Sequence, residues 1–206
     1  MLKSLDYHNV VPPPELPTRQ YRLLAATDEQ LIAKFQASGQ PADLDELVAR
    51  HLERVRNLAY RVVLCNATAD DVTQDVFIKV IRSAHTYRGQ ASVATWIYRI
   101  TLNSAKEYLR KKTQAEKHLQ RNSTPSEVGS DQPVYSAMQK EMVGEIHQAL
   151  SKLSVKLRSA IVLTSMEHLP PKEAAAIAGC STATMHWRVH QARKQLKQLL
   201  NQHFKP

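Results

Sequence analysis

The sequence predicts an all-α protein made of two small helical domains joined by a flexible linker. Apolar residues recur at three- and four-residue spacing over most of the chain, and no alternating polar and apolar run is long enough to predict a strand. A polar, turn-rich stretch with Pro125, Gly129 and Pro133 interrupts this pattern. The chain has 206 residues, 43% of them hydrophobic, which is enough to bury a core.

These interruptions set the expected domain limits. Residues 1–26 contain four prolines and should form an extended, proline-containing N-terminal arm. Residues 27–112 should form the first helical domain, and residues 113–137 the linker. Residues 138–206 should form the second helical domain.

The first domain begins with two clear helices. Thr27 can cap the first, with Gln30 as its capping-box partner, and that helix should end before Gly39. Apolar residues then repeat at helical spacing over residues 44–63, which predicts a long amphipathic helix.

Two more helices are expected in the same domain. Thr68 with Asp71 repeats the N-terminal capping signature and predicts the start of the third. The fourth should run from about Ser92 to Lys112, after a turn around Gly89.

The second domain carries the pattern of a helix-turn-helix. Pro171 suits the first position of a short helix, and Gly179 provides the tight turn after it. Ser181 can cap a second helix, whose Met185 and Val189 point back at the first. An ordinary helical hairpin with a solvated basic face is the alternative, and turn, cap and charge together favour DNA recognition.

Charge is distributed in blocks. The whole chain carries a net charge of +9, but residues 28–80 hold 9 acidic and 6 basic residues. Residues 86–121 hold 8 basic and 2 acidic residues, and residues 151–206 hold 9 and 2. Two cationic blocks behind an acidic one suggest two surfaces that face a polyanion and one that faces another partner.

Several other classes of protein and site are not expected. Cys65 and Cys180 lie far apart, without a CxxC pair, and no glycine-rich phosphate loop occurs. His186 and His190 have the spacing of metal ligands but lack an evident third ligand, so we expect neither a metal nor a cofactor. No apolar run approaches the ~18 residues of a membrane span, and residues 1–6 lack the apolar segment of a secretory signal, which favours a cytoplasmic protein without membrane insertion.

Specific motifs resemble a known family. Residues 70–78 (DDVTQDVFI) and 95–103 (TWIYRITLN), with YLR at 108–110, resemble domain two of bacterial sigma factors. The helix-turn-helix, with the RVHQARKQL that follows, resembles their domain four. A two-domain chain without the third domain resembles the extracytoplasmic-function (ECF, group four) sigma factors, over roughly residues 27–112 and 138–200.

The resemblance implies three sets of binding residues. For the core polymerase these are Asp70, Asp71, Gln74 and Asp75. For minus-10 DNA they are Tyr87, Arg88, Gly89, Gln90, Ser92, Tyr98, Arg99, Asn103, Lys106 and Arg110. For minus-35 DNA they are Thr184, His186, Trp187, Arg188, His190, Gln191, Arg193 and Lys194. Melted bases suit a loop pocket with aromatic side chains; we expect Trp96 to lie in the core rather than stack on a base.

The recognition helix departs from the commonest family pattern. His186 stands where the family often has Lys or Arg, and Ala183 where it often has glycine. The minus-35 sequence therefore cannot be carried over from a relative.

The resemblance implies a promoter-specificity subunit with no catalytic activity of its own. Its partners would be core RNA polymerase, promoter DNA and an anti-sigma factor. One alternative is a helix-turn-helix regulator that acts without being a polymerase subunit, which would leave the motifs at 70–78 and 95–103 unexplained. An enzyme that used Asp70, Asp71 and Asp75 as metal carboxylates is another, but adjacent aspartates on a helix point in different directions.

Overall fold

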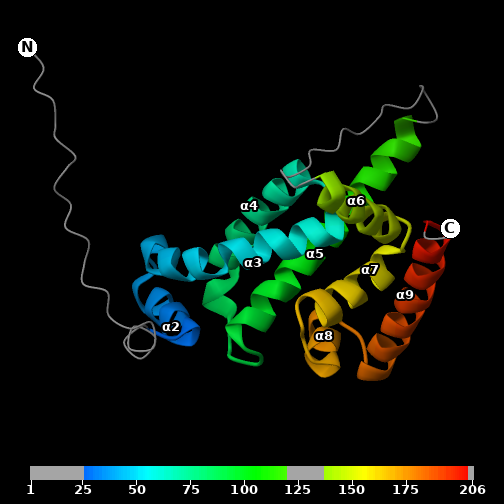
Figure 1. The fold of residues 1–206 in the computed structure, drawn as a ribbon. Coiled ribbons are helices and arrows are strands. Elements are labelled where there is room, and N and C mark those ends of the chain that lie inside the picture. Colours follow the sequence, from blue (N-terminus) through cyan, green and yellow to red (C-terminus); the bar gives the residue numbers. More distant parts are fainter. Residues whose placement is uncertain (1–25, 120–136, 204–206) are drawn as a thin grey trace, which may run out of the picture.

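The computed structural model describes residues 26–119 and 137–203, and within these ranges the chain folds entirely into helices and turns (Figure 1). This confirms the predicted all-α class. The proline-containing arm lies outside the described residues, as does most of the predicted linker. We call residues 26–119 the N-terminal domain and residues 137–203 the C-terminal domain.

The N-terminal domain packs three long helices together, with a shorter one at one end (Figure 1). The short helix is α2 (Asp28–Ser38), and the long ones are α3 (Asp45–Val63), α4 (Asn66–Ser83) and α5 (Val93–Leu119). The start of α2 is as predicted, because the Gln30 amide donates to Thr27 Oγ1 at 3.2 Å and the Thr27 amide to Gln30 Oε1 at 2.7 Å. Gly39 ends α2 in the left-handed conformation, with φ +69°.

Two boundaries differ from the sequence prediction. Helix α4 begins at Asn66 after the extended Cys65, so Thr68 is not its cap. Thr68 is buried in the first turn, where its hydroxyl donates to the Tyr108 hydroxyl at 3.4 Å. Helix α5 continues about two turns past Lys112, because residues 113–119 contain neither glycine nor proline to stop it.

The C-terminal domain contains the predicted helix-turn-helix. Its elements are α6 (Ala137–Ser151), α7 (Val155–Ile161), the π-helical turn η3 (Val162–Met166), α8 (Pro171–Ala178) and α9 (Thr182–His203). Pro171 is the first residue of α8, and Gly179 turns the chain with φ +66°. Ser181 Oγ accepts the Thr184 amide at 3.1 Å at the start of α9. Met185 is completely buried, as the packing pattern predicts.

Among the described residues, the larger of two hydrophobic clusters runs through both domains, and the smaller one lies in the C-terminal domain. Leu58, Val62 and Ile97 of the N-terminal domain belong to the same buried cluster as Leu163 and Ile177 of the C-terminal domain. Helix α8 packs beside α5, and α7 beside the end of α3 (Figure 1). We call this packing of the two domains the closed arrangement.

Polar contacts fasten the closed arrangement at the end of α3. Arg158 of α7 is 7% exposed, and its guanidinium donates to the Val62 carbonyl at 2.9 Å. Arg61 forms an ion pair with Glu167 of the other domain. The His147 ring donates from Nε2 to the Leu64 carbonyl at 2.9 Å. A cation at the carboxyl end of a helix satisfies its last carbonyls and interacts favourably with the helix dipole.

Candidate nucleic-acid interface

The acidic residues of α4 divide into paired and unpaired carboxylates. Asp70 forms an ion pair with Arg56 at 2.7 Å, and Asp75 one with Lys79 at 2.7 Å. Asp71 and Gln74 are exposed and make no side-chain hydrogen bond or ion pair with another described residue. These two are therefore the side chains best placed to bind a separate protein.

An exposed apolar residue extends the same face of α4. Ile78 is 48% exposed, and it follows Asp71, Gln74 and Asp75 at helical spacing of seven, four and three residues. We call Asp71, Gln74, Asp75 and Ile78 the α4 stripe. Beside exposed polar side chains, this isoleucine can supply the apolar centre of a protein–protein contact. The sequence analysis placed Ile78 in the motif but did not assign it to the partner surface.

The loop before α5 encloses a cleft of about 370 Å³. Its lining residues are Thr86, Tyr87, Arg88, Gln90, Ala91, Trp96 and Arg99. The Tyr87 and Trp96 rings lie 5.3 Å apart, and the Tyr87 hydroxyl donates to the Ala91 carbonyl at 2.6 Å. Trp96 packs against the core, as expected, but it is only partly buried and also lines the cleft. Two aromatic rings beside two guanidinium groups can stack on a base and hold its phosphates.

Helix α2 holds this loop in place. Gln36 donates from Nε2 to the carbonyls of Ala84 at 2.8 Å and Tyr87 at 3.0 Å. Glu29 Oε1 accepts the Val93 amide at 3.5 Å at the start of α5. The sequence analysis missed Gln36 and Glu29 because both contacts join positions 48 or more residues apart.

The remaining residues assigned to minus-10 DNA are not in this cleft. Gly89 and Asn103 are exposed beyond it, and Ser92 caps α5 by accepting the Thr95 amide at 3.2 Å. Tyr98, also assigned to minus-10 DNA, is only 5% exposed in the closed arrangement and belongs to the core. Burial raises the pKa of Tyr98, and the Glu167 carboxylate of the C-terminal domain raises it further.

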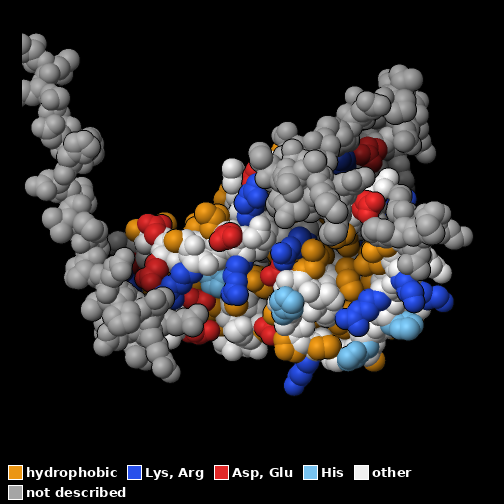
Figure 2. Space-filling view, in the orientation of Figure 1, with side chains coloured by type: hydrophobic (Ala, Val, Ile, Leu, Met, Phe, Trp, Pro, Cys, Tyr) orange, Lys and Arg blue, Asp and Glu red, His pale blue; other side chains and the backbone are white. Residues whose placement is uncertain are grey.

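The outer face of α9 is basic and rich in histidine, as Figure 2 shows over this helix. His186, His190, Arg193 and Lys194 are exposed, and Trp187 is 59% exposed. Thr184 and Gln191 are half-buried at its edges, and the Thr184 hydroxyl lies 2.8 Å from Ser181 Oγ. A helix with this face fits the major groove, where side chains read base edges.

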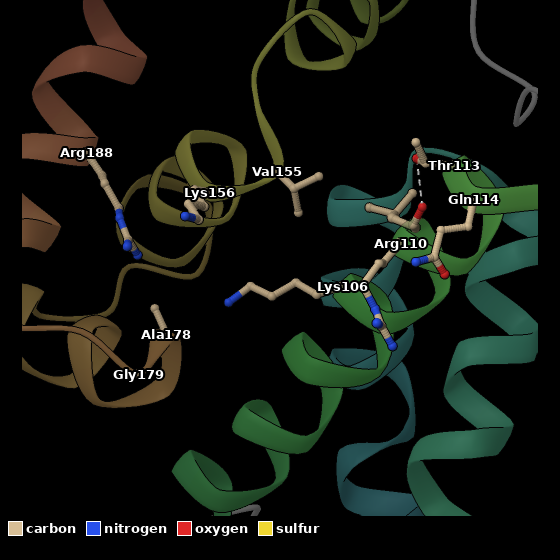
Figure 3. Close-up of a pocket in the computed structure, with 10 residues that line it drawn as sticks. Lys106, Arg110, Thr113, Gln114, Val155, Lys156, Ala178, Gly179 and Arg188 are labelled. Atoms are coloured by element: carbon tan, nitrogen blue, oxygen red, sulfur yellow. Dashed lines mark hydrogen bonds between the residues drawn. The ribbon is translucent and has the colours of Figure 1, made fainter. Parts of the chain in front are cut away.

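Arg188 points the other way, into a cavity of about 700 Å³ between the domains (Figure 3). Lys106 and Arg110 reach the same cavity from α5, and Lys156 from α7. The closed arrangement thus brings together two cations assigned to minus-10 DNA and one assigned to minus-35 DNA. Burial lowers the pKa of Lys106, and the nearby cations Arg188 and Lys156 lower it further.

Replacing Lys106 with methionine should stabilise the protein. Because the charged form of Lys106 is disfavoured when the domains close, we expect the free energy of unfolding to rise by up to about 1 kcal/mol at pH 7, the size typical of partly solvated charges. The lowered pKa means that the unfolded chain binds more protons in the window below 10.5, so the wild type gains stability there as pH rises. The difference in free energy of unfolding between Lys106→Met and the wild type should therefore become smaller towards pH 10.

Urea unfolding at pH 7 and pH 10 measures this effect. The nearby Cys180, at the turn before α9, raises the pKa of Lys106 and so opposes the lowering by Arg188 and Lys156. The matched control is Lys172→Met, since Lys172 is exposed on α8 and outside the cavity. Equal effects of the two substitutions, or a gap that does not change with pH, would contradict the argument.

No group of three His, Cys, Asp or Glu side chains in residues 26–119 and 137–203 could hold a metal ion. None of the helices described is both long and apolar enough to cross a membrane.

Two family models match the chain, one to each domain. The model described as Sigma-70 region 2 matches residues 47–115, and the model described as Sigma-70, region 4 matches residues 144–196. Among curated proteins, the ECF RNA polymerase sigma factor SigE of Mycolicibacterium smegmatis is 31% identical over 177 residues, covering 83% of this chain and 68% of its own. The ECF RNA polymerase sigma-E factor of Haemophilus influenzae is 30% identical over 179 residues, covering 83% and 94%.

Two solved structures have a similar fold. CnrH, solved in complex with the cytosolic domain of CnrY, aligns with a TM-score of 0.63 and 25% identity over 84% of this chain and 97% of its own. The sigma factor RpoE of Bartonella quintana, solved with the anti-sigma factor NepR, aligns with a TM-score of 0.62 and 24% identity over 77% and 97%.

Proposed function

The chain belongs to the ECF RNA polymerase sigma factors, which are not enzymes, and on that premise we propose how its surfaces divide the work of promoter recognition. The α4 stripe binds core polymerase, the cleft before α5 binds the minus-10 element, and the outer face of α9 binds the minus-35 element. The observation that carries this proposal is that each surface lies exposed within the matching family region. A helix-turn-helix regulator outside the polymerase would leave the region 2 match without a role.

The closed arrangement is a form that must open before it can initiate transcription. The two promoter elements are named for positions about 25 base pairs apart, which is about 85 Å along DNA at 3.4 Å per base pair. A compact chain of this length has a radius of gyration of only about 17 Å. Residues 120–136, between α5 and α6, could span up to about 58 Å when extended. Separation of the domains would also free Lys106 and Arg188 for DNA.

An anti-sigma factor is the proposed regulator of this transition. Both solved structures above hold a partner, and the partner of the sigma factor RpoE is named an anti-sigma factor. Such a partner would act in the cytoplasm by competing with core polymerase for the N-terminal domain. A purified candidate should therefore lower the affinity of the full chain for core polymerase, and simultaneous binding of both would contradict this mode of control.

In vitro transcription tests the main proposal. The full chain with purified core polymerase and genomic DNA should give a defined set of start sites, whereas core polymerase alone should not. The promoters mapped in this way should share elements near minus-10 and minus-35. Sequence-specific promoter binding by the free chain, with no stimulation by core polymerase, would support the regulator alternative instead.

The α9 residues should divide into base readers and phosphate contacts. Base-edge contacts discriminate by roughly 1–3 kcal/mol each, so His190→Ala should relax preference at particular minus-35 positions. Lys194→Ala should weaken promoter binding about equally across sequences and lower the salt slope by about 0.9, one phosphate's worth. Both side chains are exposed, so neither substitution should unfold the domain.

Binding of the holoenzyme to a library of minus-35 variants at two salt concentrations separates these roles. A uniform loss for His190→Ala would remove that residue from base recognition.

A further inference from the structure

The cavity between the domains has the composition of an anion site. Its walls come from α5, the start of α7, the turn between α8 and α9, and α9 itself (Figure 3). Lys106, Arg110, Lys156 and Arg188 line it, and no carboxylate of the described residues does. Among the described residues none of these four cations has an ion pair or a side-chain hydrogen bond, whereas Arg56, Arg61 and Lys79 are each paired with a carboxylate.

Closing the domains therefore gathers like charges. Lys106 extends from α5 towards the side of the cavity formed by α8, and Arg188 points into the same space from α9 (Figure 3). The lowered pKa of Lys106 reports both its burial and the nearness of Arg188 and Lys156. An anion between these groups would turn this repulsion into charge-assisted hydrogen bonds.

We propose that this cavity binds the phosphate chain of a nucleoside polyphosphate and that the bound ligand holds the domains closed. Its volume of about 700 Å³ is within the range of small-molecule sites. Leu109, Val155 and Ala178 supply apolar wall for a base or sugar, and Gln114 a polar edge. A cavity of this volume between packed domains is too small for duplex DNA, whose major groove alone is about 12 Å wide.

The ligand would oppose promoter binding by mass action. A ligand that binds only the closed arrangement stabilises it by RT ln(1 + L/Kd), where L is the free ligand concentration, and the coupling to DNA is reciprocal. Lys106, Arg110 and Arg188 would then serve the ligand in one state and DNA phosphates in the other. This consequence rests on the proposed function, whereas binding of the ligand does not.

Isothermal titration calorimetry of the full chain measures ligand binding to the site without polymerase or DNA. The probes are ATP, GTP and inorganic tripolyphosphate at constant ionic strength, with orthophosphate as a weak competitor. We expect Lys106→Gln and Arg188→Gln each to weaken binding about 10- to 100-fold, as loss of a charge-assisted hydrogen bond does. Lys172→Gln removes an exposed lysine outside the cavity and should change nothing.

The outcomes distinguish a specific site in the cavity from non-specific attraction of anions to a basic protein. A nucleotide that binds tighter than tripolyphosphate supports contact with base or sugar, and equal affinities assign the site to an inorganic phosphate chain. Orthophosphate that binds as well as tripolyphosphate, or an equal loss in Lys172→Gln, overturns the proposal. Circular dichroism checks that the variants fold; should either cavity variant unfold, Arg110→Gln replaces it, since Arg110 is exposed.

A second measurement tests the coupling. Saturating ligand should shrink the radius of gyration in solution scattering and weaken promoter binding by the holoenzyme. Ligand binding without an effect on the promoter would overturn the shared use of the cations while leaving the site intact.

Discussion

Replacing Arg158 with alanine should lower the free energy of unfolding by about 3 kcal/mol and loosen the closed arrangement. The guanidinium is buried and donates to the Val62 carbonyl at 2.9 Å and to the Leu153 carbonyl at 3.5 Å. Alanine leaves both carbonyls without this donor and a void in their place, and each buried group left unpaired costs about 1–3 kcal/mol. Removing a charge whose pKa burial already lowers offsets part of this loss.

Urea unfolding and solution scattering of the full chain measure the two effects. Arg82→Ala is the matched control, since Arg82 is exposed on α4 and should change stability by about 0.5 kcal/mol or less. Arg61→Ala separates the interface from the C-terminal domain itself, because the side-chain hydrogen bonds that Arg61 donates within the described residues go to Glu167 and Met166 across the interface. Arg61→Ala should raise the radius of gyration, with a smaller loss of free energy of unfolding than Arg158→Ala. A wild-type unfolding midpoint for Arg158→Ala would show that this contact does not hold the domains together.

Asp71→Lys combined with Ile78→Glu should weaken binding to core polymerase by at least about 30-fold, the loss of about 2 kcal/mol that defines an interface hot spot. Asp71 is exposed and makes no side-chain hydrogen bond or ion pair with another described residue, so its full charge is available to a basic partner. Ile78 offers the apolar contact beside it. Asp75 is a weaker choice for the test, since reversal of its charge also breaks its ion pair with Lys79.

Fluorescence anisotropy of labelled chain titrated with core polymerase measures this loss. Glu116→Lys reverses an exposed charge near the end of α5 and should leave the affinity within about twofold. The helical content of the double variant must match the wild type. Wild-type affinity of a folded double variant would move the polymerase contact away from α4.

Local signals in the sequence predicted most of the fold. The capping box of Thr27 and the Pro171, Gly179 and Ser181 pattern are interactions within a few residues, and the structure has all of them. The same logic was wrong at Thr68, where a buried contact with Tyr108 40 residues away overrides the capping signature. Propensity also underestimated α5, because a polar segment without glycine or proline can extend a helix as readily as form a linker.

The candidate site was predicted as a set of residues but not as an arrangement. Family resemblance gave Lys106 and Arg188 to two different DNA elements, and nothing in their spacing indicates that they share one cavity. Periodicity likewise cannot distinguish the buried Tyr98 from an exposed aromatic residue on the same helix. The sequence analysis did not single out Arg158, because an arginine is expected at the surface. Its burial is explained by two carbonyl partners, Val62 across the interface and Leu153 in its own domain.

The shared core also bears on how long the protein survives in a cell. Opening the domains uncovers side chains such as Leu163 and Ile177, which are completely or almost completely buried when closed. An opened chain without polymerase would expose this apolar surface to aggregation with other chains. Its less tightly packed backbone would also be accessible to proteases. Degradation that acts on a transiently opened state follows the population of that state. Every contact that favours closure, Arg158 foremost, thus sets the turnover of the unbound protein as well as its access to promoters.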